Sequence, residues 1–414
     1  MTASQFSILF LAALVLTTSL RLWLSLRHSK HIARNRASVP VEFQTHISLA
    51  EHHKAADYSV AKIRLGLIDI ALDSLFLLAL TLGSVIDNVD QQLRQLFGTG
   101  HVQGLALFTS LGLLSFLVGL PSSLYRTFSL EARFGFNKMT PALWLADLAK
   151  GTLLTLLIGG PMLLAVLWLM ATMGETWWLY VWAVWLGFNL LVLFLYPTLI
   201  APLFNKFTPL DDPVLQSRIQ TLLARCGFTF SGLFVMDGSK RSSHGNAYFT
   251  GFGKSKRIVF FDTLLQHLTP SEIDAVLAHE LGHFKHHHVL KRFVALAGLA
   301  LVLLWFLGQL MNQAWFFQGL GVAQPSTAMV LLLFSLVLPV FLFPLAPFTS
   351  GISRRQEYEA DAYAAQQTAG ADLVSALVKL YRDNAATLTP DPLHSLFHDS
   401  HPPAAMRIAR LQTV

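Results

Sequence analysis

Long apolar runs recur along most of the chain, each about as long as the roughly 20 residues that a helix needs to cross a bilayer. Two of the runs also carry charge, because the second contains Asp69 and Asp73 and the sixth begins with Lys291 and Arg292. This pattern predicts a polytopic membrane protein dominated by α-helices. The seven predicted spans are Phe6 to Leu26, Leu65 to Ile86, Val102 to Leu124, Leu148 to Met173, Trp178 to Leu203, Val289 to Met311 and Ala328 to Phe348.

The composition agrees with a membrane protein. Hydrophobic residues make up 53% of the 414 residues and charged residues 13%, against roughly 25% charged in an ordinary soluble domain. The net charge of +6 suits cytosolic loops that contact anionic lipids. The sequence has no pattern of interleaved basic and aromatic residues that would indicate binding to nucleic acid. The single cysteine, Cys226, excludes an intrachain disulfide and is interpreted as a free core thiol.

The orientation of the spans follows from the basic residues around them. A cleaved signal peptide has its basic residues before the apolar run. Here Arg27, Lys30 and Arg34 come after the first run, so we expect this run to be retained as a span. Basic residues near span ends stay in the cytosol. We therefore expect an external N-terminus, cytosolic connections at residues 27–64 and 126–147, and external connections near Arg94, Gly174 and Trp315.

A five-residue motif, His279-Glu280-Leu281-Gly282-His283, carries the clearest chemistry. Residues i and i+4 share a helix face, so both imidazoles can reach one tetrahedral metal ion while Glu280 reaches a water bound to that metal. Just upstream, Thr269 to Glu272 forms a capping box with proline at the first helical position. The motif therefore lies on a helix that begins near Thr269 and indicates a zinc hydrolase. The alternative is a surface helix that merely contains two histidines.

The third ligand has to come from elsewhere in the chain. Position 289 is valine, which excludes the metzincin pattern. Glu357 and Asp361 lie one turn apart in a segment predicted to be helical, and two spans return this segment to the side of the membrane that holds His283. We predict Glu357 as the third zinc ligand and Asp361 as a partner of a ligand histidine or of the leaving amine. The alternative is that these acids pair with nearby arginines on a solvated face.

The three consecutive histidines that follow the motif, His286 to His288, lie too far along the helix axis to join a tetrahedral site with His279 and His283. We interpret them as interface or polar-face histidines.

Several ordered stretches resemble one family, the CAAX prenyl proteases, membrane zinc endopeptidases that remove the last three residues of farnesylated proteins. Beside the motifs around His279 and Glu357, the similar stretches are residues 51–58, 134–138, 201–207, 239–249 and 400–403. The resemblance implies seven helices around a water-filled chamber. It also implies a split α+β zinc protease domain of the gluzincin type on the cytosolic side.

The expected division of the chain follows from the spans and from this resemblance. Residues 1–204 would form an N-terminal membrane domain with five spans, and residues 289–350 a membrane hairpin. Residues 205–288 and 351–414 would be the two halves of the protease domain, one with the histidine motif and one with Glu357.

The resemblance also implies roles for individual residues. One Zn²⁺ per chain would be held by His279, His283 and Glu357, with Glu280 as the general base. His401 and Arg407 would face the developing oxyanion. Asn246, with Ala247 and Tyr248 on an expected extended segment from Asn246 to Phe252, would pair with the substrate backbone as an added strand.

The predicted function is therefore zinc-dependent cleavage near the C-terminus of a prenylated or hydrophobic protein or peptide substrate by a monomeric membrane endopeptidase. Short external connections suggest a compact bacterial member in the inner membrane, or the endoplasmic reticulum if the source is eukaryotic. One alternative is a quality-control zinc protease acting on non-prenylated membrane proteins. Another is a transporter or scaffold with a structural zinc ion, in which Asp69 and Asp73 line an ion path.

Overall fold

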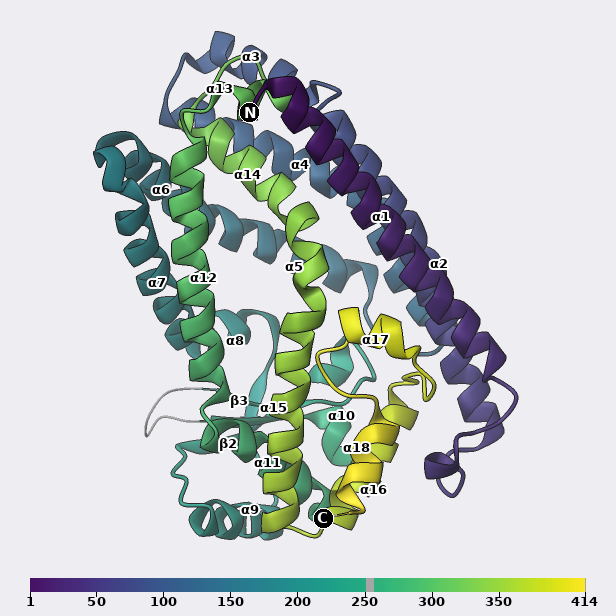
Figure 1. Ribbon diagram of the computed structural model, residues 1–414. Coiled ribbons are helices and arrows are strands. Elements are labelled where there is room, and N and C mark those ends of the chain that lie inside the picture. The colour runs from purple at the N-terminus through teal and green to yellow at the C-terminus, as the bar shows by residue number, and fades with distance from the viewer. Residues whose placement is uncertain (251–256, 414) are drawn as a thin grey trace.

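The computed structural model describes residues 1–250 and 257–413, and it is mostly helical (Figure 1). The helices of the first half are α1 (Ala3–Arg34), α2 (Leu49–Leu80), α3 (Val85–Phe97), α4 (His101–Tyr125), α5 (Pro141–Leu154), α6 (Gly160–Thr172), α7 (Trp177–Leu195), α8 (Ala201–Phe204) and α9 (Pro213–Arg225). Those of the second half are α10 (Asp262–His267), α11 (Pro270–Lys285), α12 (His288–Leu310), α13 (Ala314–Gly319), α14 (Thr327–Leu342), α15 (Ala346–Gln367), α16 (Gly370–Asp383), α17 (Pro392–His398) and α18 (Ala404–Leu411). Four strands are described: β1 (Phe207–Pro209), β2 (Gly232–Met236), β3 (Ala247–Thr250) and β4 (Arg257–Phe261).

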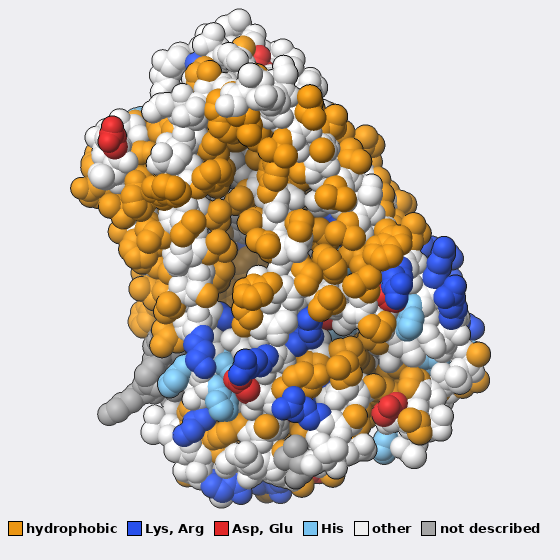
Figure 2. All heavy atoms as spheres, viewed as in Figure 1, with side chains coloured by type: hydrophobic (Ala, Val, Ile, Leu, Met, Phe, Trp, Pro, Cys, Tyr) orange, Lys and Arg blue, Asp and Glu red, His pale blue; other side chains and the backbone are white. Residues whose placement is uncertain are grey.

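Within the described residues, six continuous helices are long and apolar enough to cross a membrane, and a bent pair makes a seventh candidate. The bent pair is α2 with α3, which meet at 50° and cover the predicted span from Leu65 to Ile86. Figure 2 shows hydrophobic side chains over the upper part of one face and most charged side chains toward its lower end. The prediction of a polytopic helical membrane protein is confirmed.

The acids of the second predicted span have partners. The Asp69 carboxylate accepts hydrogen bonds from Ser122 Oγ at 2.6 Å and from an Arg126 guanidinium nitrogen at 2.9 Å. Asp73 lines a cavity of about 370 Å³ together with Thr17 and Arg21. Asp69 is thus engaged in an ion pair between two helices.

The four strands form one small mixed sheet in the order β1-β2-β4-β3. Strand β2 runs parallel to β4, whereas β1 and β3 are antiparallel to their neighbours, and this order leaves β3 at one edge. Leu233, Ile258 and Phe260 alternate toward one face, as expected for a half-covered sheet. That face packs in a common core with α9, α11, α15 and α16.

The two sequence segments of the expected protease domain meet in this core. Leu277 and Leu281 of α11 pack with Ala364 of α15 and Leu377 of α16. The enclosed chamber implied by the resemblance stays a prediction, although Figure 2 shows a recess in the middle of the apolar face.

Candidate metal centre

Helix α11 places the two histidines of the motif by local rules alone. Thr269 accepts a hydrogen bond from the backbone N–H of Glu272, and the Glu272 carboxylate accepts one from the N–H of Thr269, which confirms the predicted capping box. The helix that begins there carries His279 and His283 on one face. Their Nε2 atoms lie 3.3 Å apart, so the two imidazoles converge on one point.

Glu357 of α15 completes the group. Its Oε2 lies 3.4 Å from His279 Nε2 and its Oε1 lies 3.4 Å from His283 Nε2. Within the described residues these three side chains are the group that could hold a metal ion, with their ligand atoms within 4.8 Å of one another. Glu357 is 2% exposed, and its Oε2 has no hydrogen-bond partner there. A buried carboxylate that has one oxygen without a donor, and whose two oxygens each face an imidazole nitrogen, fits a divalent cation.

The close approach of the two helices depends on Gly282. A Cβ atom added at Gly282 would lie 2.8 Å from the Cα of Ala360 and 3.2 Å from its Cβ. Only a residue without a side chain lets α15 come this near to α11. The glycine of the motif therefore sets the distance between the histidines and Glu357.

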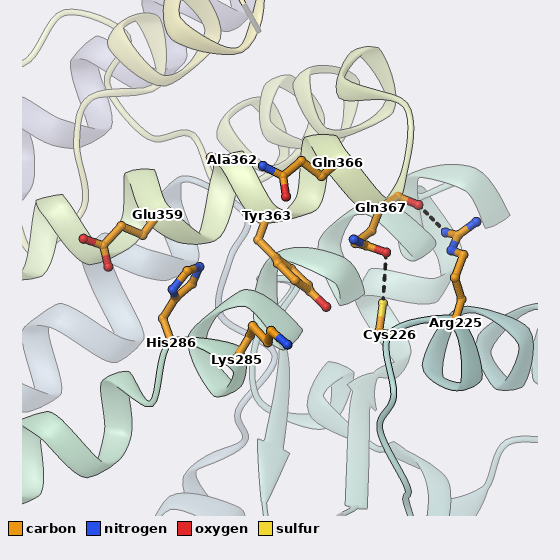
Figure 3. Close-up of a pocket in the computed structure, with 9 residues that line it drawn as sticks. All are labelled: Arg225, Cys226, Lys285, His286, Glu359, Ala362, Tyr363, Gln366 and Gln367. Atoms are coloured by element: carbon orange, nitrogen blue, oxygen red, sulfur yellow. Dashed lines mark hydrogen bonds between the residues drawn. The ribbon is translucent and has the colours of Figure 1, made fainter.

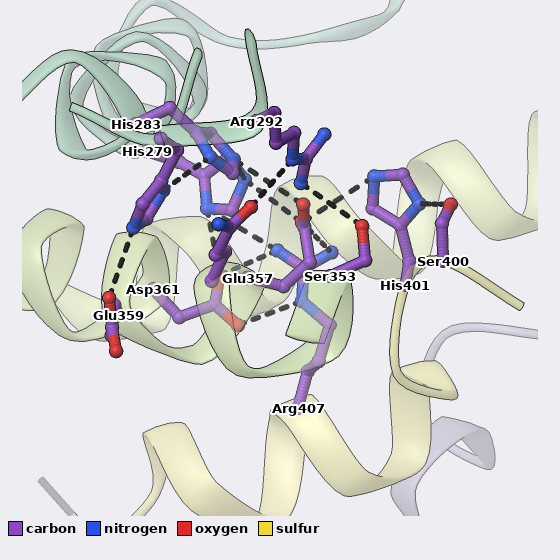
Figure 4. A network of polar contacts seen from close by, with 12 residues as sticks. His279, His283, Arg292, Ser353, Glu357, Glu359, Asp361, Ser400, His401 and Arg407 are labelled. Atoms are coloured by element: carbon purple, nitrogen blue, oxygen red, sulfur yellow. Dashed lines mark hydrogen bonds and ion pairs between the residues drawn. The ribbon is translucent and has the colours of Figure 1, made fainter. Parts of the chain in front are cut away.

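The outer nitrogen of His279, Nδ1, contacts Asp361, which is in turn held by Arg407. His279 Nδ1 lies 2.9 Å from Asp361 Oδ1, and Arg407 of α18 donates from Nε to Asp361 Oδ2 at 2.8 Å (Figure 4). Asp361 and Arg407 are 3% and 6% exposed. The arrangement fixes the imidazole with Nδ1–H toward Asp361 and its Nε2 lone pair toward Glu357 and His283.

His283 is held by a different pair, which the sequence did not indicate. Its Nδ1 lies 2.9 Å from Nδ1 of His288, and Nε2 of His288 lies 3.0 Å from Glu359 Oε2. His288 is 1% exposed. The interpretation of His286 to His288 as interface or polar-face residues is thus wrong for His288, which lies behind a predicted ligand. Helical spacing could not find it, because His287 adopts a left-handed conformation and ends the regular path of α11.

The surroundings shift the pKa values of the motif in opposite directions. Burial favours the neutral form of His279, but the nearby carboxylates of Asp361 and Glu357 outweigh it and raise the pKa to about 9. Burial, together with the charge of His279, lowers the pKa of His283 to about 4. Burial also raises the pKa of Glu280, which is half-buried beside His279 and Glu357. A raised carboxyl pKa suits a group that accepts and then returns a proton.

The C-terminal segment brings two further predicted residues to the site. His401 Nε2 lies 3.5 Å from Glu357 Oε2, and Arg407 Nη1 lies 3.9 Å from the same oxygen. Ser400 Oγ lies 3.0 Å from His401 Nδ1. The His401 side chain is 62% exposed, whereas that of Arg407 is buried against Asp361. His401 is therefore the freer of the two to turn toward a substrate.

The predicted substrate-pairing residues lie at the sheet edge. Asn246 precedes β3, where its carbonyl accepts from the N–H of Phe261 at 2.9 Å and its side-chain Oδ1 accepts from the N–H of Ala247 at 2.8 Å. Ala247 and Tyr248 begin β3, the edge strand. The expected extended segment reached Phe252, and its last two residues lie outside the described part of the chain.

A cavity of about 540 Å³ lies on the other side of α15 (Figure 3). It is lined by Cys226, Lys285, His286, Glu359 and Tyr363, among others, and by none of the three candidate ligands. Cys226 is half-buried, with Sγ 3.6 Å from Gln367 Oε1, and has no disulfide partner in a chain with one cysteine. This cavity is thus distinct from the metal centre.

Comparison with known proteins reveals two family matches that together cover most of the chain. The family described as "CAAX prenyl protease N-terminal, five membrane helices" matches residues 28–206. "Peptidase family M48" matches residues 209–414.

Individual proteins are similar over most of their length. The "CAAX prenyl protease 1 homolog" of Arabidopsis thaliana is 41% identical over 71% of this chain and 72% of its own. "CAAX prenyl protease 1" of Saccharomyces cerevisiae is 38% identical over 75% of this chain and 72% of its own. The crystal structure of S. mikatae Ste24p superposes with a TM-score of 0.91 and 32% sequence identity, covering 98% of both chains.

Proposed function

The chain belongs to the CAAX prenyl protease 1 family of membrane zinc metallopeptidases, and on this premise we propose that it cleaves the C-termini of prenylated proteins at the centre formed by His279, His283 and Glu357. The observation that carries the proposal is the convergence of these three side chains on one point, with a buried Glu357 oxygen that has no donor among the described residues.

The chemistry assigned to the centre is that of a zinc hydrolase with one Zn²⁺ per chain. His279, His283 and Glu357 would hold the zinc ion, whose chemistry would be to lower the pKa of a bound water and to polarise the substrate carbonyl group. Glu280 takes the proton of the attacking water and returns it to the leaving amine. Its raised pKa makes the Glu280 carboxylate a stronger base toward the attacking water.

The residues around the centre orient a metal ligand and stabilise the oxyanion of the reaction. Asp361 holds the Nδ1–H of His279, and Arg407 holds Asp361, so that the ligand nitrogen keeps its direction. His401, which is exposed and next to Glu357, donates to the oxyanion of the tetrahedral intermediate, and the positive charge of Arg407 supports it.

The substrate is proposed to bind as a further strand along β3, with Asn246, Ala247 and Tyr248 as its partners. Strand β3 pairs with β4 on one side and stands at the edge of the sheet on the other. An edge strand presents free backbone groups that an extended peptide can use.

The placement in the membrane is proposed from charge. Arg27, Lys30 and Arg34 follow the apolar part of α1, which favours a cytosolic connection to α2 and an external N-terminus. Both protease segments, residues 205–288 and 351–414, would then face the cytosol. A bacterial origin stays a prediction.

The function is tested with Glu280→Gln, assayed for zinc content and for cleavage of a farnesylated CAAX peptide. We expect full zinc occupancy and a loss of roughly 10²–10⁴-fold in turnover, as for removal of a general base. The matched control is Glu175→Gln, an exposed glutamate in the connection between α6 and α7. Cleavage by Glu280→Gln at the wild-type rate would refute the mechanism.

The substrate class is tested with one peptide prepared with and without its farnesyl group. A CAAX protease should cleave the farnesylated form faster. Equal or faster cleavage of the unmodified peptide would favour the alternative of a quality-control protease for non-prenylated substrates.

A further inference from the structure

A further cavity lies between the end of a membrane helix and the outer face of the sheet. It has a volume of about 460 Å³ and is lined by the connection that follows α7, by α8 and by all four strands. The side chains that matter for its chemistry are those of Thr198, Asn205, Lys206, Phe234, Tyr248 and Arg257.

The sheet has two faces with different partners. Leu233, Ile258 and Phe260 enter the protease core. Phe234 and Arg257 alternate with these residues and point to the opposite face, as the period of two in a strand requires. The cavity occupies this opposite face, where the sheet meets α8.

The cavity is positively charged. Lys206 and Arg257 both line it, and no acidic residue does. Neither side chain makes an ion pair with another described residue. The guanidinium of Arg257 lies over the ring of Phe234, with its carbon 5.4 Å from the ring centroid. Asp237 is the nearby acid, but it accepts from the backbone N–H of Lys206 and not from its ammonium group.

Hydrogen-bond donors accompany the two cations. Arg241 donates to Oδ1 of Asn205 at 2.7 Å, which leaves the Nδ2 hydrogens of Asn205 as donors. Thr198 contributes a hydroxyl group to the lining. Cations and neutral donors in a cavity without acids favour an anion with several oxygen acceptors, such as a phosphate.

The cavity lies at the boundary between apolar and polar surface. It adjoins the end of the candidate span Gly174–Phe204. Three large side chains of this end, Tyr196, Leu199 and Leu203, are 48%, 60% and 48% exposed and would face lipid. Charged groups directly beyond such a surface lie at the depth of the lipid headgroups.

We propose that this cavity binds the phosphate of an anionic phospholipid, with Lys206 and Arg257 as its cationic partners. The acyl chains would lie along the exposed apolar side of the α7 end, and the headgroup would lie against the sheet. A comparable cavity lined by Arg36, Arg64 and Arg133 is a weaker candidate, because its lining includes Asp57, which accepts two hydrogen bonds from Arg36.

The test measures binding of phosphatidylglycerol to the full-length protein in detergent, by native mass spectrometry. Phosphatidylcholine serves as the lipid without net charge and inorganic phosphate as the soluble competitor. A cation near a membrane surface contributes roughly fivefold in affinity, so the double variant Lys206→Ala, Arg257→Gln should weaken phosphatidylglycerol binding by about thirtyfold.

Two further variants separate a specific site from a general charge effect. Lys30→Ala removes an exposed cation from the end of α1 and should leave phosphatidylglycerol binding unchanged. Arg257→Lys keeps the charge and should retain most of the binding. The thermal midpoint of the double variant without lipid should match that of the wild type, while the upward shift caused by phosphatidylglycerol is lost.

Several results would overturn the proposal. These are unchanged binding in the double variant, an equal loss in Lys30→Ala, and equal binding of phosphatidylcholine. Displacement of the lipid by inorganic phosphate at a similar concentration would instead identify a site for free phosphate. None of these outcomes depends on protease activity, so the proposed function is tested separately.

Discussion

The two sides of the metal centre are built in different ways. On the α11 side, His279 and His283 are four residues apart in one capped helix, so local geometry alone makes them converge. On the α15 side, Glu357 arrives only after a membrane hairpin and depends on the contact of Gly282 with Ala360. One part of a metal ligand set can thus be positioned by a single helix and the other part by the packing of distant segments. Only the second part can be disturbed by a distant change in packing.

The largest effect is expected on the tertiary side, from Glu357→Ala. This change removes one of three ligands and should lower zinc affinity by more than the roughly 10–100-fold that an outer partner contributes. Zinc content after dialysis, measured by elemental analysis, checks it. Glu175→Ala, which removes an exposed glutamate far from the site, should keep its zinc. Full zinc occupancy in Glu357→Ala would point to another third ligand.

The next largest effect is expected from His288→Ala, which removes the residue that supports His283 on the α11 side of the centre. Removing this buried ring leaves Nδ1 of His283 without its partner, so zinc affinity should fall by roughly 10–100-fold. A chelator competition assay measures it. His288→Asn offers an amide oxygen near the position of the ring nitrogen and should recover part of the loss.

The exposed neighbour of His288 provides the control. His287→Asn changes a residue in a left-handed conformation that asparagine tolerates, and it should leave zinc affinity unchanged. An equal loss in both variants would mean that the turn between α11 and α12 matters, rather than the contact to His283.

The contact between the two sides is tested with Gly282→Ala. The added Cβ would collide with Ala360, and overpacking of this kind costs about 1–3 kcal/mol of folding free energy. A lower thermal midpoint together with weaker zinc binding is expected. Gly298→Ala is the matched control, because a Cβ there meets nothing within 4 Å and alanine favours the helix. Stability equal to the wild type in Gly282→Ala would show that the helices separate at no cost.

The smallest effect concerns the attachment of the C-terminal segment to α1. The ring of His394 stacks on that of His28, with ring centroids 4.0 Å apart, and meets the tilted ring of His398 at 4.4 Å. Asp391 accepts from the N–H of His394, pairs with Arg27, and with Asp399 supplies the nearby negative charge. Burial, together with the neighbouring histidines, lowers the pKa of His394 to about 3.

The sign of the pH dependence follows from this shift. Below its ordinary pKa of 6.5, the histidine takes up a proton in the unfolded chain but not in the folded one, so stability falls as the pH drops from there toward 3. Because His394 is only half-buried, we expect the loss of folding free energy near pH 5 to be about 1 kcal/mol. His394→Phe keeps the stack and should flatten the pH dependence of the thermal midpoint, whereas the exposed control His46→Gln should not. If the thermal midpoint of His394→Phe changed with pH as steeply as that of the wild type, His394 would be excluded as the source of the pH dependence.

Much of the molecule could be predicted from the sequence, because much of it follows local rules. Apolar run length predicted the membrane helices, and the exception was informative: the run with Asp69 and Asp73 belongs to the bent pair α2 and α3. The family and the enzyme class are confirmed by the comparisons. The roles of Glu280, Asp361, His401 and Arg407 stay predictions, although the structure brings all four to the candidate centre.

What the sequence determined by itself was the apolar length of the spans, the capped start of α11 and the placement of two histidines on one face of that helix, since each depends on residues within a few turns of one another. Only the tertiary structure decided that His288 lies behind His283, that Gly282 admits α15, and that Arg407 holds Asp361. These contacts join residues across helix ends and a membrane hairpin, where no repeat along the chain relates them. Their geometry depends on how the helices pack, and packing is decided by the whole folded chain.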